Sequence, residues 1–435
     1  MKNNAAMQSL TKTERLNEWT FSEKVLFRFF SLFFGITIFP FPLYIIPFVG
    51  HALSFIDDAM NWLVVFTGKH ILHLSYDITV QPNGSGDTTW NYVQLFIITV
   101  LALIGCIIWS IADRKKKNYN RWLYWLLVGV RYYLAYSLIA YGSYKIFKTQ
   151  FPAPSIGRLT ETYGQSSPMG LAWTFLGYSK AYNYFMGIAE AGGGLLLLFR
   201  RTAIFGVLLS MIVTANIVAI NFCFDVPVKL YSSTLLLMSL FILAPEVSRL
   251  YQFFFQRKPI SLKAHAFTFQ TRWKRISAYI IKAAFILYIL ITFTFQGISA
   301  LKQYGDDAPK PKLYGYYNIN TFVKNTDTLP PLLTDTTRWN KLVFGYYDRV
   351  SVKMMNDTLI SFTYANDTLK HQLTLTGRSD TTLKYHLNYR ILPADTLELT
   401  SAENNLYMRL NKINANDFLL VKRGFHWINE YPLNR

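Results

Sequence analysis

The stretch GIAEAGGGLLLLFRR, residues 187–201, has the composition of a membrane-spanning helix, yet it carries a carboxylate near its centre. A charge at the middle of a bilayer costs about 2.5–3.5 kcal/mol even on the lenient insertion scale, so Glu190 needs a partner. Gly187, Ala191 and Gly194 fall on one face at helical spacing. Because such a face lets a neighbouring helix approach closely, the stretch predicts a charge buried in a tight helix–helix contact.

The apolar run before it offers a partner for Glu190. Arg131 lies ten residues beyond Arg121, roughly 15 Å along a helix. Glu190 lies at a similar distance from the outer end of its own helix, so we expect the two residues to form a buried ion pair. The face that begins at Arg131 continues through Gly142 to Lys145. The alternative to this structural role is that Glu190 takes part directly in proton transfer.

The whole chain has the composition of a multi-pass membrane protein: 435 residues, 51% of them hydrophobic, with a formal net charge of +19. Basic residues gather beside the apolar runs, nineteen on one side of the membrane and six on the other. This asymmetry predicts a cytoplasmic amino terminus and an external carboxyl terminus, and it explains the charge without a nucleic-acid partner. After a cytoplasmic segment, 1–23, we predict a membrane domain over 24–300 with spans at 24–49, 91–112, 121–147, 178–199, 202–222, 229–248 and 276–298.

Residues 52–75 are apolar but are interrupted by charged side chains, including Asp57, Asp58 and Lys69. An eighth span here would reverse every later loop against the charge asymmetry. We therefore predict an amphipathic helix on the outer membrane face. His70 and His73 lie within the segment, but no zinc-motif spacing is present, so no metal site is expected.

The chain changes character after residue 300. A polar linker is predicted over 301–338, and short β-rich segments then recur about every ten residues. Asp-Thr pairs separate several of them, and aspartate favours tight turns by bonding its own backbone; the pairs lie at 357–358, 367–368, 380–381 and 395–396. The spacing predicts a small antiparallel β-barrel-like domain over 339–435, outside the cytoplasm. The terminal KRGFHWINEYPLNR is expected to supply its closing strand.

A second group of polar residues lies at the corner between the predicted fifth and sixth spans. Asn216 and Asn221 fall within the apolar run and need partners, and Asp225 and Lys229 follow. Lys145 is expected to emerge at the same membrane level. We predict that Lys145, with the last three of these residues, lines an outward-open, net positive cavity for a polar or anionic lipid head group. A local Asp225–Lys229 turn is the alternative.

Arg131, Gly142 and Lys145 on one helix, followed by GIAEAGGGLLLLF on the next, resemble the DoxX family of small bacterial membrane proteins. The resemblance covers residues 121–250, and the other helices and the β domain lie outside it. It implies a bacterial inner-membrane location, in which the β domain that the charge asymmetry puts outside the cytoplasm would be periplasmic. Because some relatives are linked to thiosulfate:quinone oxidoreduction, it also implies redox chemistry with a quinone. Arg131, Lys145 and Glu190 would then be catalytic, since a quinone site needs a cation and a proton donor.

A hypothesis from another class remains open. The chain is then a non-enzymatic membrane assembly or sensor protein, whose outer β domain binds a protein partner or lipid while the helices anchor it. A remote third resemblance is to the vitamin-K-carboxylase-like membrane family, whose helices also carry buried basic residues. The sequence itself names no substrate.

Overall fold

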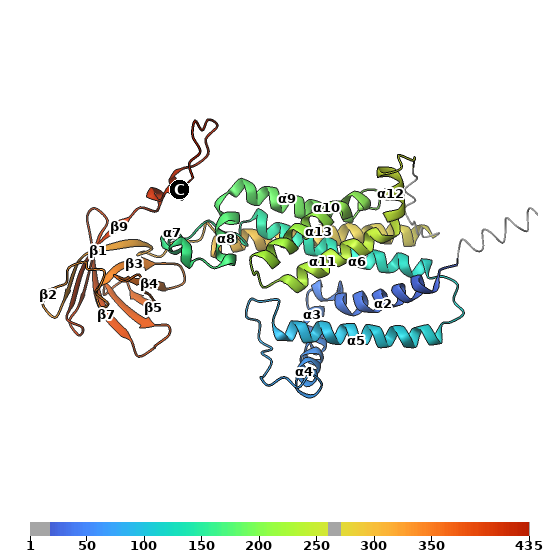
Figure 1. Cartoon of the computed structure of the whole chain (residues 1–435), viewed down its shortest axis with the longest axis horizontal. Helices are drawn as coiled ribbons and strands as arrows, with labels where there is room; N and C mark the ends of the chain where they lie inside the picture. The colour runs from blue at the N-terminus through green and yellow to red at the C-terminus, as the bar shows by residue number, and fades with distance from the viewer. Residues whose placement is uncertain (1–17, 260–270, 435) are drawn as a thin grey trace, which may run out of the picture. The chain divides into compact units, whose positions relative to one another are not determined.

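The computed structural model describes residues 18–259 and 271–434. The chain divides into two compact units. The helical unit comprises Met1–Gln150 with Lys180–Ile298, and the barrel unit comprises Phe151–Ser179 with Ser299–Arg435. Figure 1 labels the helices of the first and the strands of the second.

Long apolar helices form the helical unit, and buried side chains from most of them meet in one core. Thr20 begins α2 and Thr88 begins α5 with capping boxes, in which each threonine and the residue three positions later bond each other's backbone. The helices are α2 (Phe21–Ile38), α3 (Val49–Ala52), α4 (Ser54–His70), α5 (Thr89–Ala112), α6 (Asn120–Ile146), α9 (Lys180–Leu197), α10 (Ala203–Cys223), α11 (Lys229–Leu243), α12 (Val247–Phe254) and α13 (Arg272–Gln303), with the short turns η1 (Leu43–Ile45) and η3 (Ala244–Glu246).

Within the described ranges, six helical stretches are long and apolar enough to cross a membrane: Phe21–Ile45, Thr89–Ala112, Asn120–Ile146, Ala203–Cys223, Lys229–Phe254 and Arg272–Gln303. They suggest a multi-pass membrane protein, as the composition predicts. The predicted span at 178–199 corresponds to α9, which is not among the six. It has 18 residues and includes Lys180 and Glu190.

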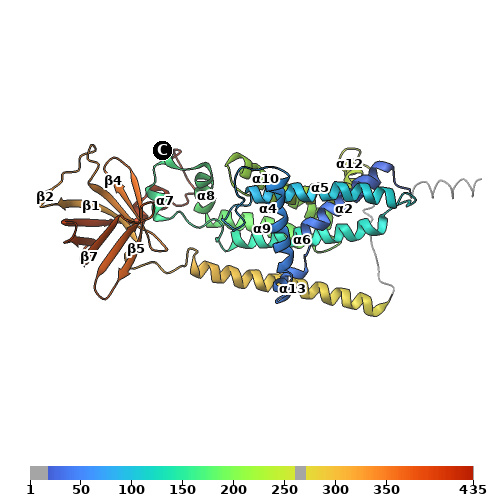
Figure 2. The ribbon, with the colours of Figure 1, turned by 90° about the horizontal axis from the view of Figure 1, so that it is seen from below.

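The ambiguous segment 52–75 forms α4, which is also not among the six stretches. Val64 of α4 packs on Val93 and Ile97, in the first turns of α5. Figure 2 shows α4 running across the long helices rather than beside them. Its predicted place on a membrane surface stays a prediction.

The barrel unit contains a closed antiparallel barrel of eight strands. Neighbours along the chain pair in order from β3 to β9, β1 pairs with β3, and β1 also pairs with β9, which closes the sheet. The two-residue β2 pairs only with β1. The strands are β1 (Gly315–Lys324), β2 (Asp327–Thr328), β3 (Trp339–Phe344), β4 (Arg349–Met354), β5 (Leu359–Asp367), β6 (Gln372–Gly377), β7 (Lys384–Leu392), β8 (Thr396–Ser401) and β9 (Leu406–Ile413).

Apolar side chains fill the barrel interior. Alternate residues such as Val350, Val352 and Phe362 point inward, as period-two strands require. Arg338, only 2% exposed, donates hydrogen bonds to the carbonyls of Ile319 and Trp339, among others. A barrel of eight strands has room for such side chains and little more.

The Asp-Thr pairs lie in the hairpin turns, as predicted. Asp357 and Asp395 adopt left-handed φ values of 65° and 53°, which aspartate tolerates better than most residues. Asp367 accepts hydrogen bonds from the backbone amides of residues 369 and 370, and Asp380 accepts one from the amide of Thr382. These are the local side-chain-to-backbone bonds expected of turn-forming aspartates.

Both ends of the β domain differ from the prediction. The first strand, β1, lies inside the segment 301–338 that was expected to be a linker. The terminal segment is wrong as a closing strand, because β9 closes the barrel and the chain then forms η4 (Ala415–Asp417) and the short α14 (Leu419–Lys422). Trp427 and Tyr431 beyond it are 91% and 85% exposed.

The segment between α6 and α9 belongs to the barrel unit. It contains α7 (Ile156–Thr160), η2 (Tyr163–Gln165) and α8 (Pro168–Tyr178). Ile156 packs on Tyr316 of β1 and Val343 of β3, and the backbone amide of Ala153 donates to a carboxylate oxygen of Asp306 over 2.9 Å. The loop after α6 is therefore tied to the chain that follows α13.

Candidate functional site

The small residues of α9 meet α6 at very close range. A Cβ added to Gly142 would lie 2.6 Å from the amide nitrogen of Ala191 and 2.7 Å from the carbonyl oxygen of Gly187. One added to Gly194 would lie 2.8 Å from the carbonyl oxygen of Ala135. Only glycine fits at these positions, so the backbones are in contact over about two helical turns. The small-residue face thus makes the tight helix–helix contact that its spacing predicts.

Glu190 forms its ion pair with Lys145, not with Arg131. The Lys145 Nζ donates to Glu190 Oε2, and the two side chains are only 6% and 3% exposed. The predicted Arg131–Glu190 pair is therefore wrong, and the partner of Glu190 is a lysine further along the same helix.

The register of the helix pair explains the difference. Gly187 lies against Gly142 and Ile146, near the end of α6. Glu190 therefore reaches the level of Lys145, whereas Arg131 is fourteen residues away, roughly 21 Å along the helix. The prediction assumed that Arg131 and Glu190 lie at equal depth in the membrane, but α6 has 27 residues and α9 has only 18.

An aromatic side chain of α6 lies beside the pair and contacts a second one on α11. Lys145 Nζ lies 5.9 Å from the ring centroid of Tyr141, within the range of a cation–π contact. The ring of Tyr141 is 5.7 Å from that of Tyr231, whose hydroxyl donates to Ser137 Oγ over 2.8 Å. The arrangement is a buried charge pair beside a short line of hydroxyl groups.

Arg131 lies elsewhere in the helical unit, beside a cavity near the α9–α10 turn. Arg200 and Arg201 of that turn line the same cavity. The guanidinium of Arg131 packs over the ring of Tyr132, 5.7 Å from its centroid. The three predicted catalytic residues thus divide into one pair and one separate arginine.

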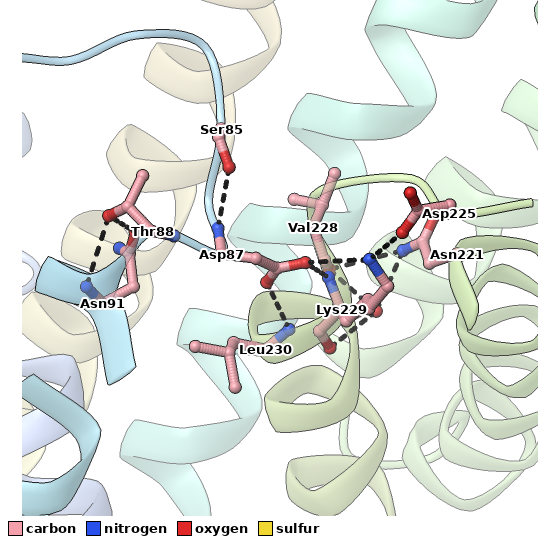
Figure 3. Close-up of polar contacts among 10 residues, drawn as sticks. Ser85, Asp87, Thr88, Asn91, Asn221, Asp225, Val228, Lys229 and Leu230 are labelled. Atoms are coloured by element: carbon pink, nitrogen blue, oxygen red, sulfur yellow. Dashed lines mark hydrogen bonds and ion pairs between the residues drawn. The ribbon is translucent and has the colours of Figure 1, made fainter. Parts of the chain in front are cut away.

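Some of the residues predicted for the outer cavity lie in a corner of mutually bonded polar groups (Figure 3). Lys229 Nζ lies 2.9 Å from an oxygen of Asp225. Asn221 donates to the carbonyl of Val228 and to Ser232 Oγ. Lys145 pairs with Glu190, and Asn216 is exposed on α10. Three of the four residues predicted to line the cavity therefore come together here, and Lys145 does not join them.

Asp87, which sequence reasoning missed, completes this corner. It precedes α5, and its two carboxylate oxygens accept from the amides of Lys229, over 2.7 Å, and Leu230, over 2.9 Å. These amides begin α11 and have no partner within their own helix. An oxygen of Asp87 also lies 3.8 Å from Lys229 Nζ. Two carboxylates against one ammonium make the corner net negative, where a net positive cavity had been expected.

Sequence reasoning also missed a buried arginine in the first half of α2. Arg28, 3% exposed, donates to the hydroxyl of Tyr119, to Ser110 Oγ and to the carbonyl of Asp113. Tyr119 in turn donates to the Asp113 carboxylate over 2.8 Å. This network joins the first half of α2 to the end of α5 and the start of α6. Only the position of Arg28 inside an apolar run could have indicated it.

No group of three or more His, Cys, Asp or Glu side chains among residues 18–259 and 271–434 is placed to hold a metal ion. His51, His70 and His73 accordingly form no such cluster there.

Comparison with known proteins gives one relationship. No protein-family model matches the chain, and no solved structure matches it. The chain is 36% identical over 132 residues to a protein of Bacillus subtilis (strain 168) described as uncharacterized protein YwoB. The match spans 30% of this chain and 82% of YwoB. By this match the chain belongs to the same family as YwoB.

Proposed function

We propose that this chain is an integral membrane protein of DoxX type, located in a bacterial inner membrane, that serves redox chemistry with a quinone. The observation that carries the proposal is the Lys145–Glu190 pair, buried between two closely packed helices. A membrane-buried ionisable pair is costly, and such pairs commonly mark sites of proton transfer or substrate binding. Six helices of suitable length and composition support the membrane assignment.

Contacts within the barrel unit support α9 as a seventh span. The loop after α6 packs on the barrel, which follows α13, so both lie on one side of the membrane. Between them the chain passes through α9, α10, α11 and α13. An even number of crossings returns the chain to the same side, and the number is even if α9 also crosses, which supports the seventh span.

Contacts within the helical unit support the same topology. Asp87, before α5, binds the start of α11, and α5, α6, α9 and α10 lie between them. Arg28, near the start of α2, binds Asp113, which follows α5, so both residues lie on the same side of the membrane. The number of crossings between them is even if α2 and α5 cross and α4 does not. With the basic residues inside, these seven spans leave the amino terminus in the cytoplasm and the barrel in the periplasm.

The proposed chemistry uses the charge on both members of the pair. Reduction of a quinone to its quinol takes two electrons, which an external donor such as thiosulfate would supply, and two protons. Lys145 would stabilise the negative charge that develops on a quinone oxygen, and Glu190 would pass protons to it. Because both side chains are buried and bonded to each other, access requires the pair to separate.

The test is quinone binding and turnover by the full chain in mild detergent. Lipid extracts of the purified protein are analysed for quinone by mass spectrometry, and thiosulfate-dependent reduction of a soluble quinone analogue is followed by absorbance. Lys145→Gln and Glu190→Gln should each lower turnover at least about tenfold, as loss of a positioned acid or base does. Asn216→Ala, on an exposed face of α10, should leave turnover unchanged. Absence of both quinone and turnover in the wild type would contradict the proposal.

A second candidate is the non-enzymatic assembly or sensor protein, and two observations favour it. The Lys145–Glu190 pair is closed, as a structural pair is. The barrel interior is filled by side chains, so a partner would bind the outer surface of the barrel. Under this hypothesis, Glu190→Gln keeps function in cells whenever the variant protein is stable, whereas the redox hypothesis requires its loss.

A further inference from the structure

We propose that the cavity beside Arg131 binds a phosphate oxyanion, carried by the head group of an anionic lipid or present as a free phosphate compound. The cavity has a volume of about 340 Å³ and lies between the first half of α6, the α9–α10 turn and the end of α11. Nothing in the proposed redox reaction uses it, and the inference does not depend on that reaction.

Positive charge dominates the polar part of the lining. Arg131, Arg200 and Arg201 line the cavity together with a single carboxylate, Glu246. That carboxylate is already paired, since both of its oxygens accept from Arg249 Nη1, over 2.9 and 2.8 Å. Three guanidinium groups therefore line the cavity, and a fourth, that of Arg249, neutralises the one acid among the described lining residues.

A nearby lysine adds to the positive potential. The Nζ atom of Lys282, on α13, lies 4.4 Å from the ring centroid of Phe199, the residue that precedes Arg200. It interacts electrostatically with both Arg131 and Arg200. Like charges gathered at one site repel each other, and a bound anion would relieve this repulsion.

The hydrogen-bonding state of Arg131 points to a ligand. Its Nε is buried and has no hydrogen-bond partner among the described residues. A buried donor without an acceptor costs about 1–3 kcal/mol, and charged donors cost more. A phosphate oxygen in the cavity would satisfy this donor, and guanidinium groups match phosphate in shape and charge. Arg200 is held at the rim by donating to the hydroxyl of Tyr124.

The remaining wall fits the apolar part of a lipid. Its apolar side chains are Leu127, Val128, Ile204, Val207, Ile242 and Leu243. The volume lies at the small end of the range for ligand pockets, about 300–1,000 Å³, and exceeds what one phosphate ion needs. Basic pockets between membrane helices on the cytoplasmic side typically bind anionic head groups, and the proposed topology puts the α9–α10 turn on that side.

The test measures ligand retention by the full chain in detergent, using native mass spectrometry. The probes are phosphatidylglycerol, zwitterionic phosphatidylcholine and inorganic phosphate, each added to delipidated protein. Phosphatidylglycerol should be retained in preference to phosphatidylcholine. Arg200→Gln and Arg131→Gln should each weaken retention at least about tenfold, as expected for loss of a charge-assisted hydrogen bond.

Two further variants keep the result interpretable. Arg114→Gln removes an exposed arginine from the loop after α5 and should retain lipid like the wild type. Arg131→Lys keeps the positive charge but loses the planar set of guanidinium donors, so it should retain phosphatidylglycerol more weakly than the wild type. This variant tests the proposal even if Arg131→Gln fails to fold. Displacement of phosphatidylglycerol by inorganic phosphate would identify a free phosphate compound as the source, and resistance to it would identify the lipid. Equal retention by the wild type, Arg200→Gln and Arg131→Lys would overturn the proposal, as would equal losses in Arg200→Gln and Arg114→Gln.

Discussion

Lys145 and Glu190 form an ion pair between α6 and α9, at the level where Gly142 meets Ala191. Loss of either partner strands the other charge, which typically costs about 3–5 kcal/mol in a buried pair. Lys145→Ala and Glu190→Ala should therefore each lower the unfolding free energy in detergent by about that amount, and the double variant should lose much less than the sum. Denaturant titration followed by circular dichroism measures all three.

The matched control for this coupling is Arg131. Because Arg131 lies roughly 21 Å along α6 from Lys145, the losses in Arg131→Ala and Glu190→Ala should add. Coupling between Arg131 and Glu190, or its absence between Lys145 and Glu190, would mean that the register of α6 and α9 is different in solution.

A second prediction concerns the glycine at this contact. Gly142→Ala places a methyl group 2.6 Å from a backbone nitrogen of α9, so the helices must move apart. Overpacking of this kind typically costs about 1–3 kcal/mol. Gly192→Ala is the control, because a Cβ there meets nothing within 4 Å and alanine favours a helix by about 0.5–1 kcal/mol. Thermal denaturation should move in opposite directions for the two variants, and equal effects would contradict the close approach.

The helix–helix contact was predictable because its signal is local. Gly187, Ala191 and Gly194 repeat at helical spacing, and spacing alone determines which face they share. The partner of Glu190 was not predictable in this way. Its identity depends on the offset between the two helices, which follows from the packing of Gly142, Gly187 and Gly194 across the contact. A pattern within one helix carries no information on such an offset.

The same limit explains the outer corner and the barrel. Asp87 caps a helix that begins 142 residues later, and no local pattern links the two. The hairpin turns of the barrel were predictable because their signals are local. Asp367 and Asp380 bond amides two or three residues away, and Asp357 and Asp395 adopt left-handed φ values. The first strand, β1, was missed because its main pairing is with β9, at the far end of the domain.

The cap supplied by Asp87 gives a third prediction. Asp87→Ala leaves the first amides of α11 without an acceptor, and loss of a helix cap typically costs about 0.5–2 kcal/mol. Hydrogen exchange at the start of α11 should therefore become faster, with little change at the end of the helix. Asp225→Ala is the comparison, because its carboxylate is 84% exposed and bonds only the Lys229 side chain in the described structure. Faster exchange in Asp225→Ala alone would contradict the assignment of the cap to Asp87.

The buried Arg28 network gives a fourth prediction. Arg28→Met removes the charge but leaves the hydroxyl of Tyr119 and the carbonyl of Asp113 without their donor. Breaking such a network should lower the unfolding free energy by about 1–3 kcal/mol or more. Ser110→Ala removes one acceptor only and should cost less. A protein in which Arg28→Met is as stable as the wild type would show that the network does not stabilise the junction of α2, α5 and α6.

The last prediction concerns acid stability of the barrel. Hydrogen bonds from the Thr382 hydroxyl and amide, in the turn between β6 and β7, lower the pKa of the Asp380 carboxyl. Its folded-state pKa therefore lies below the unfolded value of about 3.9. The unfolded state then binds protons first as the pH falls, so the stabilisation by Asp380 is fully present above about pH 5 and is lost as the pH drops through the lowered pKa.

Asp380→Ala should accordingly increase hydrogen exchange in β6 and β7 at neutral pH. The difference from wild type should shrink as the solution is acidified, after correction for the intrinsic pH dependence of exchange. Glu403→Ala, at an exposed position in the turn between β8 and β9, should show no such pH-dependent difference. A difference for Asp380→Ala that stays constant from neutral to acidic pH would mean that the carboxylate does not stabilise the turn through its charge.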